Sequence, residues 1–189
     1  EGGHGMLALS PRAVARLETY TPSWPLPKIF RLAKKGVVTL DLFEGATINT
    51  PSMLAVEDHL NALQWAEDVG GLSTLIARSE ANLASIATWV RHSNWASFLC
   101  RDEANRSSTS ICLSITDVAF TQEPEERQRS IIKSMVTLLE AEEVALDIGG
   151  YRDAPPGLRI WGGSTVENQD IEALLPWLDW AYETVSSRA

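Results

Sequence analysis

Residues 124–143, PEERQRSIIKSMVTLLEAEE, decide the fold because they predict a helix between segments that are typical of strands. Pro124 suits the start of a helix, where a missing backbone N–H costs little. Glu125 and Glu126 follow in the first turn, where the helix dipole favours negative charge. Apolar residues then recur at helical spacing, so one face of this helix is expected to be buried. These residues are Ile131, Ile132, Met135, Val136, Leu138 and Leu139.

Short apolar segments with strand character lie on both sides of that helix. They are residues 95–100 (WASFLC), 109–115 (TSICLSI), 144–148 and 158–161. A last helix is predicted over 164–185, with Ser164 and Glu167 spaced as a capping box. Pro176 is expected to cause a kink or a fresh helix start near Leu175. This order of elements predicts helices packed on a small, mostly antiparallel sheet. The second half of the chain is therefore expected to be α+β.

The first part of the chain is less regular. A strand is expected at residues 6–9, followed by a short helix with Ser10 as its N-cap and Pro11 in its first turn. Residues 21–30, TPSWPLPKIF, contain three prolines. Because each proline fixes φ and removes a backbone donor, this stretch is expected to be an extended surface arm.

Two consecutive helices are predicted to join at the Gly70–Gly71 pair. The first runs from Thr50, and the second continues to about Arg91. Because a double glycine ends a helix readily, it is our expected domain boundary, dividing the chain into residues 1–69 and 70–189. The alternative is a helical hairpin inside one domain.

The charge balance makes some classes of function improbable. The sequence has 25 acidic and 16 basic side chains, for a net charge of −9, which repels nucleic acid. No apolar run has the length needed to span a membrane.

The cysteines and histidines show no pattern of a metal or disulfide site. Cys100 and Cys112 form no metal-binding or disulfide pattern, which is typical of a reducing compartment and predicts a cytoplasmic protein. The histidines lack zinc-ligand spacing, so no metal site is expected.

Two arginines are the candidate binding residues. Arg152 and Arg159 flank a Pro-Pro-Gly turn that could bring both side chains to one site. Arginine suits a carboxylate or phosphate ligand because its planar fork donates paired, charge-assisted hydrogen bonds. The alternative is that Arg152 pairs with Asp153 or Asp147 on the surface. Trp161, just after the turn, could wall a pocket or simply pack.

Three stretches, residues 1–32, 46–72 and 147–183, together resemble phosphoserine aminotransferase, in the form found in alphaproteobacteria. The likeness covers essentially all 189 residues but only the C-terminal half of that enzyme. It implies a fold type I pyridoxal-phosphate aminotransferase with an α/β fold whose C-terminal part is α+β. It also implies a homodimer with active sites at the subunit interface. Residues 1–69 would end the large cofactor-binding domain, and 70–189 would form the small domain that closes over substrate. The implied reaction transfers an amino group between glutamate and 3-phosphohydroxypyruvate, giving phosphoserine in serine synthesis.

The resemblance also implies roles for four residues. Arg159 matches the arginine that binds the substrate carboxylate, and Arg152 falls near a His-Arg pair that contacts the substrate phosphate. Tyr151 stands where that histidine is expected. The spacing from Arg152 to Arg159 is one residue longer than in the family. Asn49 and Thr50 match a pair that reaches the cofactor phosphate of the other subunit, although Thr50 could also simply cap the following helix.

No catalytic residue is assigned to this chain. The resemblance places the Schiff-base lysine shortly upstream of Glu1, and none of the four lysines here has a matching context. We therefore expect a fragment that is inactive without its N-terminal portion, although a tag remnant before a natural start at Met6 is the alternative. Two rival hypotheses are another pyridoxal-phosphate enzyme, such as an alanine–glyoxylate transaminase or a cysteine desulfurase, and a non-catalytic α+β module that binds anions.

Overall fold

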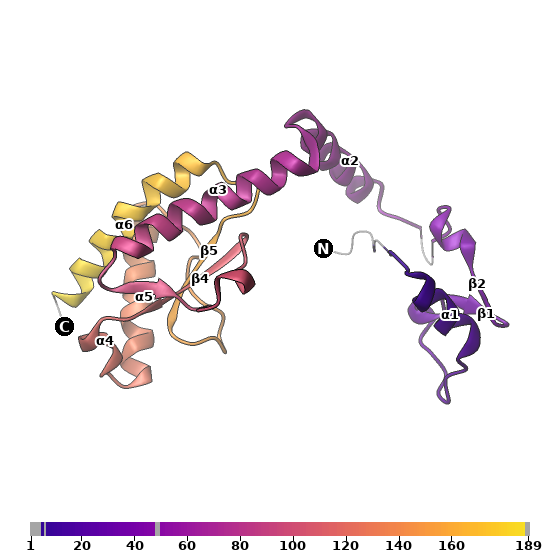
Figure 1. Cartoon of the computed structure of the whole chain (residues 1–189), viewed down its shortest axis with the longest axis horizontal. Helices are drawn as coiled ribbons and strands as arrows, with labels where there is room; N and C mark the ends of the chain where they lie inside the picture. Colours follow the sequence, from indigo (N-terminus) through magenta and orange to yellow (C-terminus); the bar gives the residue numbers. More distant parts are fainter. Residues whose placement is uncertain (1–4, 6, 48–49, 188–189) are drawn as a thin grey trace. The chain divides into compact units, whose positions relative to one another are not determined.

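The computed structural model describes residue 5, residues 7–47 and residues 50–187. The chain divides into two compact units, residues 1–65 and 66–189, which are coloured along the sequence in Figure 1. This division falls inside the helix α2 (Met53–Asp68), a few residues before the glycine pair. The domain roles expected for the two parts stay predictions.

The described part of the first unit contains the short helix α1, most of α2 and a hairpin of two two-residue strands. Ser10 caps α1 by accepting a hydrogen bond at Oγ from the backbone N–H of Ala13 at 3.2 Å, as predicted. Residues 7–9 are not a strand, so that expectation is wrong for them. Val38 is the buried apolar residue of this unit's described part. Besides α2, the elements are α1 (Pro11–Thr19), η1 (Lys28–Phe30), β1 (Ala33–Lys34), β2 (Val37–Val38) and η2 (Leu40–Phe43).

The Gly70–Gly71 pair separates α2 from α3 (Gly71–His92), as the sequence predicts. Both glycines have positive φ, 113° and 73°, which glycine adopts without a steric penalty. A Cβ atom at Gly70 would lie 2.4 Å from Oγ1 of Thr74, so a side chain at Gly70 would force that threonine to move.

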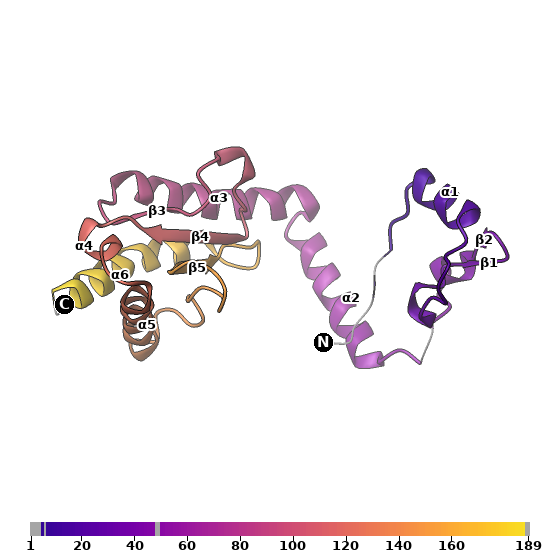
Figure 2. The ribbon, with the colours of Figure 1, turned by 90° about the horizontal axis from the view of Figure 1, so that it is seen from below.

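The second unit is built on a three-stranded antiparallel sheet in the order β3–β4–β5, which Figure 2 shows. The strands are β3 (Ala96–Phe98), β4 (Ser110–Ile115) and β5 (Gly157–Trp161). The strand expected at residues 144–148 is wrong, because Asp147 adopts a left-handed backbone with φ of 55°. The chain instead makes a single antiparallel bridge from Gly149 to Leu158.

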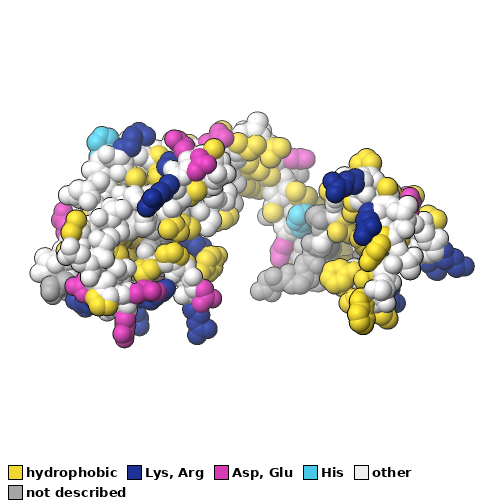
Figure 3. Space-filling view, turned by 60° about the horizontal axis from the view of Figure 1, so that its bottom comes forward, with side chains coloured by type: hydrophobic (Ala, Val, Ile, Leu, Met, Phe, Trp, Pro, Cys, Tyr) yellow, Lys and Arg dark blue, Asp and Glu magenta, His cyan; other side chains and the backbone are white. Residues whose placement is uncertain are grey.

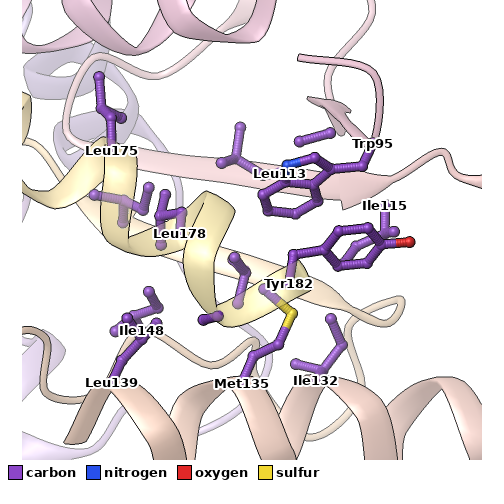
Figure 4. Packing of buried hydrophobic residues seen from close by; sticks show 14 of the residues in the cluster. Trp95, Leu113, Ile115, Ile132, Met135, Leu139, Ile148, Leu175, Leu178 and Tyr182 are labelled. Atoms are coloured by element: carbon purple, nitrogen blue, oxygen red, sulfur yellow. The ribbon is translucent and has the colours of Figure 1, made fainter. Parts of the chain in front are cut away.

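The helices of this unit bury apolar side chains in one core against the sheet. Met135 and Leu139 of one helix and Leu178 of another have no exposed surface, and Figure 4 shows them in one cluster with Leu113 of β4. Burying such a side chain stabilises the fold by about 1.5–3 kcal/mol. Alongside α3, the helices are α4 (Val118–Thr121), α5 (Glu125–Ala141) and α6 (Asn168–Ser186), with the 3-10 turn η3 (Glu103–Asn105).

The start of α6 differs from the predicted capping box. The helix begins at Asn168, and the side chain of Glu167 forms an ion pair with Arg78 of α3. Arg78 also donates from Nε to the carbonyl oxygen of Ser164 at 2.7 Å. A contact from a distant helix therefore replaces the local one.

The two faces of the sheet have different characters. Burial alternates along β4, so that Ile111, Leu113 and Ile115 enter the core. The intervening Ser110, Cys112 and Ser114 face the other way, because successive side chains of a strand point to opposite sides. These residues are half-buried and small. The face opposite the core is therefore open and polar, and it carries Arg159.

Candidate functional site

Arg159 lies in the middle of β5, on the open face of the sheet. Its register partner on β4 is Cys112, and its backbone N–H donates to the carbonyl of Ile148 at 2.8 Å on the other side. The side chain is 15% exposed, since flanking segments cover most of its length. The backbone of Arg159 is therefore paired on both sides of its strand.

The Arg159 guanidinium is partly satisfied by two neighbours. Nη2 donates to Oδ2 of Asp147 at 3.0 Å, and the group lies over the ring of Tyr151, 4.5 Å from its centroid. The Asp147 side chain is 89% exposed, so water weakens this ion pair. Asp147 therefore pairs with Arg159, and not with Arg152 as the surface-pairing alternative had it.

The Nε atom of Arg159 is buried and lacks a hydrogen-bond partner among the described residues. Leaving a buried donor unpaired costs about 1–3 kcal/mol, and more when the group is charged. A carboxylate placed beside Nε would accept its hydrogen bond and balance the positive charge of the guanidinium. The geometry thus suits Arg159 to an anionic ligand.

Arg152 has different surroundings from Arg159. It is exposed and lines a cavity of about 400 Å³ between α5 and the segment 149–157, together with Arg129 and Lys133. In the described part of the chain, its side chain makes no ion pair with Asp153 or Asp147, so the surface-pairing alternative is wrong. Glu140 is the one acidic residue on this cavity's wall, which leaves the wall net positive. Figure 3 shows basic and acidic side chains interspersed over the visible face of the second unit.

The two residues expected at the cofactor phosphate lie in the first unit. Asn49 falls outside the described residues, and Thr50 is exposed, just before α2. The hydroxyl that caps this helix belongs to Ser52, which accepts from the N–H of Ala55 at 3.4 Å. Thr50 is therefore not the capping residue, which removes the alternative role proposed for it.

The expectation that none of this chain's lysines supplies the amine of a pyridoxal-phosphate enzyme stays a prediction. Lys28, Lys34, Lys35 and Lys133 are all exposed, whereas the amine must meet an enclosed cofactor. Across residues 5, 7–47 and 50–187, no three His, Cys, Asp or Glu side chains gather where they could hold a metal ion. No helix in the same residues is long and apolar enough to cross a membrane.

Comparison with curated sequences gives relatives of one kind. Over 185 residues, or 98% of the chain, it is 56% identical to the phosphoserine aminotransferase of Methanosarcina mazei. The resemblance to phosphoserine aminotransferase is confirmed. The enzyme of Methanosarcina barkeri is 55% identical over 98% of the chain, and that of Corynebacterium glutamicum is 25% identical over 95%. The finer expectation of an alphaproteobacterial form stays a prediction.

The chain spans about half the length of the phosphoserine aminotransferases that it matches, 47% for both Methanosarcina enzymes. The matched part is their C-terminal half. No protein-family model matches the chain.

Solved phosphoserine aminotransferases share the fold. The enzyme of Bacillus circulans subsp. alkalophilus matches 78% of the chain and 42% of its own length, with a TM-score of 0.54 and 19% identity. A second, studied for radiation damage of its Schiff base, matches 72% of the chain and 35% of its own length, with a TM-score of 0.55 and 19% identity. The expected α/β fold of fold type I is thereby confirmed for this chain.

Three contacts of the candidate arginines were not predicted. Asp147 and Tyr151 contact Arg159, and Arg129 of α5 contacts the turn that carries Arg152. Only the spacing of Glu125 and Arg129, one helical turn apart, could have been read from the sequence as an ion pair. The contact between α5 and the turn depends on tertiary packing and leaves no sequence signal.

Proposed function

We propose that this chain is the C-terminal portion of a phosphoserine aminotransferase, which transfers an amino group between glutamate and 3-phosphohydroxypyruvate in serine biosynthesis. The proposal includes a cytoplasmic homodimer in which an N-terminal portion supplies the lysine and pyridoxal 5′-phosphate. It rests on 56% identity to a phosphoserine aminotransferase across nearly the whole chain. The rival hypotheses of another pyridoxal-phosphate enzyme and of an anion-binding module have no comparable support.

Arg159 is proposed to bind the α-carboxylate of the substrate. The unpaired, buried Nε–H and the neighbouring Nη2–H can donate two parallel hydrogen bonds to a carboxylate. Because the side chain is largely shielded from water, such an interaction is stronger than one on the surface. Asp147 occupies part of the guanidinium through an exposed carboxylate, which a substrate could displace at small cost.

Arg152 is proposed to contact the phosphate of the substrate, since it is exposed and shares a net positive wall with Arg129 and Lys133. Asn49 and Thr50 are proposed to contact the cofactor phosphate of the partner subunit. When bound, pyridoxal phosphate supplies the electron sink for amino transfer. The share of this chain is to orient the substrate through charge and hydrogen bonds.

The experiment compares the 189-residue chain alone with the same chain joined to the N-terminal half of a Methanosarcina relative. We expect the chain alone to show neither the absorbance of bound pyridoxal phosphate nor transamination of phosphoserine. The joined protein is expected to show both. Cofactor binding or turnover by the isolated chain would contradict the proposal, as would a folded joined protein that turns over alanine and not phosphoserine.

A further inference from the structure

We propose that Arg129 is a positioning residue, which holds the turn 151–154 so that Tyr151 and Arg152 are presented to the substrate. Arg129 lies on α5, and its side chain is 42% exposed. Its guanidinium donates from Nη1 to the carbonyl oxygen of Arg152 at 3.4 Å, and from Nη2 to that of Ala154 at 3.0 Å. A single side chain thus bonds two backbone acceptors of one turn.

Glu125 fixes the orientation of Arg129. Its Oε1 accepts from Nε of Arg129 at 3.0 Å and from Nη2 at 2.6 Å. A surface ion pair one helical turn apart contributes little stability by itself. Here it aims the remaining N–H groups at the turn, which an isolated ion pair would not require.

The turn has few other means of holding its shape. One internal hydrogen bond, from the N–H of Ala154 to the carbonyl of Tyr151 at 3.0 Å, closes it. Pro155 and Pro156 follow, and neither has an N–H to donate. The Arg129 bonds therefore supply a substantial share of the contacts that fix this segment.

The held turn leads to both candidate arginines. Arg152 belongs to the turn itself, and the ring of Tyr151 packs on the guanidinium of Arg159 at 4.5 Å. Lysine could not replace Arg129, because an ammonium group lacks the rigid fork that reaches a carboxylate and two carbonyls together. The substrate-facing half of this inference rests on the proposed function, whereas the backbone contacts do not.

The test uses R129K, with R127K as the matched control on the same helix. Arg127 is exposed and lines a different cavity, away from residues 149–157. In the 189-residue chain, NMR hydrogen exchange at the Ala154 amide is expected to quicken about fivefold in R129K, with the amides of β4 unchanged. Equal exchange in the two variants would overturn the inference.

The second readout uses the complete enzyme, that is, this chain joined to an N-terminal portion as in the experiment above. R129K is expected to raise the KM for phosphoserine about fivefold, to raise the KM for glutamate less, and to leave kcat within about twofold. Faster exchange with an unchanged KM for phosphoserine would overturn the positioning role. Failure of the unmodified enzyme to transaminate phosphoserine would instead refute the proposed function, and with it the substrate-facing half of this inference.

Discussion

Arg159 donates to Asp147 through Nη2 at 3.0 Å, while its buried Nε remains without a partner in the described structure. Nη2 is therefore occupied by an exposed carboxylate, whereas the neighbouring Nε of the same guanidinium is available to a ligand. This asymmetry leads to the first prediction.

Asp147→Asn is expected to lower the KM of the complete enzyme for phosphoserine. The variant removes a carboxylate that competes with the substrate, but the Asp147 side chain is 89% exposed and its ion pair is weak. The change should therefore be at most about fivefold. Steady-state kinetics of D147N and of D153N, a neighbouring carboxylate, would measure it. A rise in KM in D147N alone would show that Asp147 orients Arg159.

Tyr151→Phe and Tyr151→Ala separate the ring of Tyr151 from its hydroxyl. The ring lies 4.5 Å from the Arg159 guanidinium, and such a contact is worth about 0.5–1 kcal/mol. We expect Y151F to bind phosphoserine normally and Y151A to bind it about two- to fivefold more weakly. Calorimetric titration checks this, and equal weakening in both variants would assign the effect to the hydroxyl.

The ion pair of Glu167 with Arg78 is expected to stabilise the fold in a way that is lost at acid pH. The hydrogen bond from Arg78, with its charge, lowers the pKa of the Glu167 carboxyl below its ordinary 4.5. A lowered folded-state pKa means that the stabilisation is present above the ordinary value and is lost as pH falls through the folded one. The unfolding free energy of E167Q should therefore depend less on pH below 4.5 than that of the unmodified chain. Urea unfolding across this window, with E126Q as control, measures the difference; identical slopes would contradict it.

Replacing Asp179 is expected to destabilise the second unit. Its carboxylate accepts from Nε1 of Trp89 at 2.9 Å and from Nε1 of Trp95 at 2.7 Å. Trp95 in turn stacks on Tyr182 with centroids 4.4 Å apart. Asp179→Ala should lower the unfolding free energy by about 2–3 kcal/mol, because both indole donors lose their acceptor. Urea denaturation followed by tryptophan fluorescence tests this, and a change as small as that of the exposed control D153A would refute it.

Local chemistry accounts for the parts of the fold that could be predicted. Ser10 with Pro11, and the Gly70–Gly71 pair, mark helix ends through their own backbone preferences, and the alternating residues of β4 mark its buried face. The strand predicted at 144–148 is wrong because Asp147 adopts a left-handed backbone conformation. Aspartate tolerates this conformation, but its presence in a sequence does not predict it.

The candidate site was predictable only in part. Arg159 can be named from its sequence context, and its place on the open sheet face follows from strand alternation. The partners that define its chemistry, Asp147 and Tyr151, lie twelve and eight residues earlier, and only the folded chain brings them to it. The same holds for Arg129, whose hydrogen bonds reach across 23 and 25 residues.

The most direct measurement is the affinity of the complete, cofactor-loaded enzyme for phosphoserine with Arg159 replaced by Ala. The account predicts that R159A retains the absorbance of bound pyridoxal phosphate while its Kd for phosphoserine rises about tenfold to a hundredfold, because a charged pair of hydrogen bonds to the substrate carboxylate is lost. An unchanged Kd in a folded, cofactor-loaded R159A enzyme would contradict it.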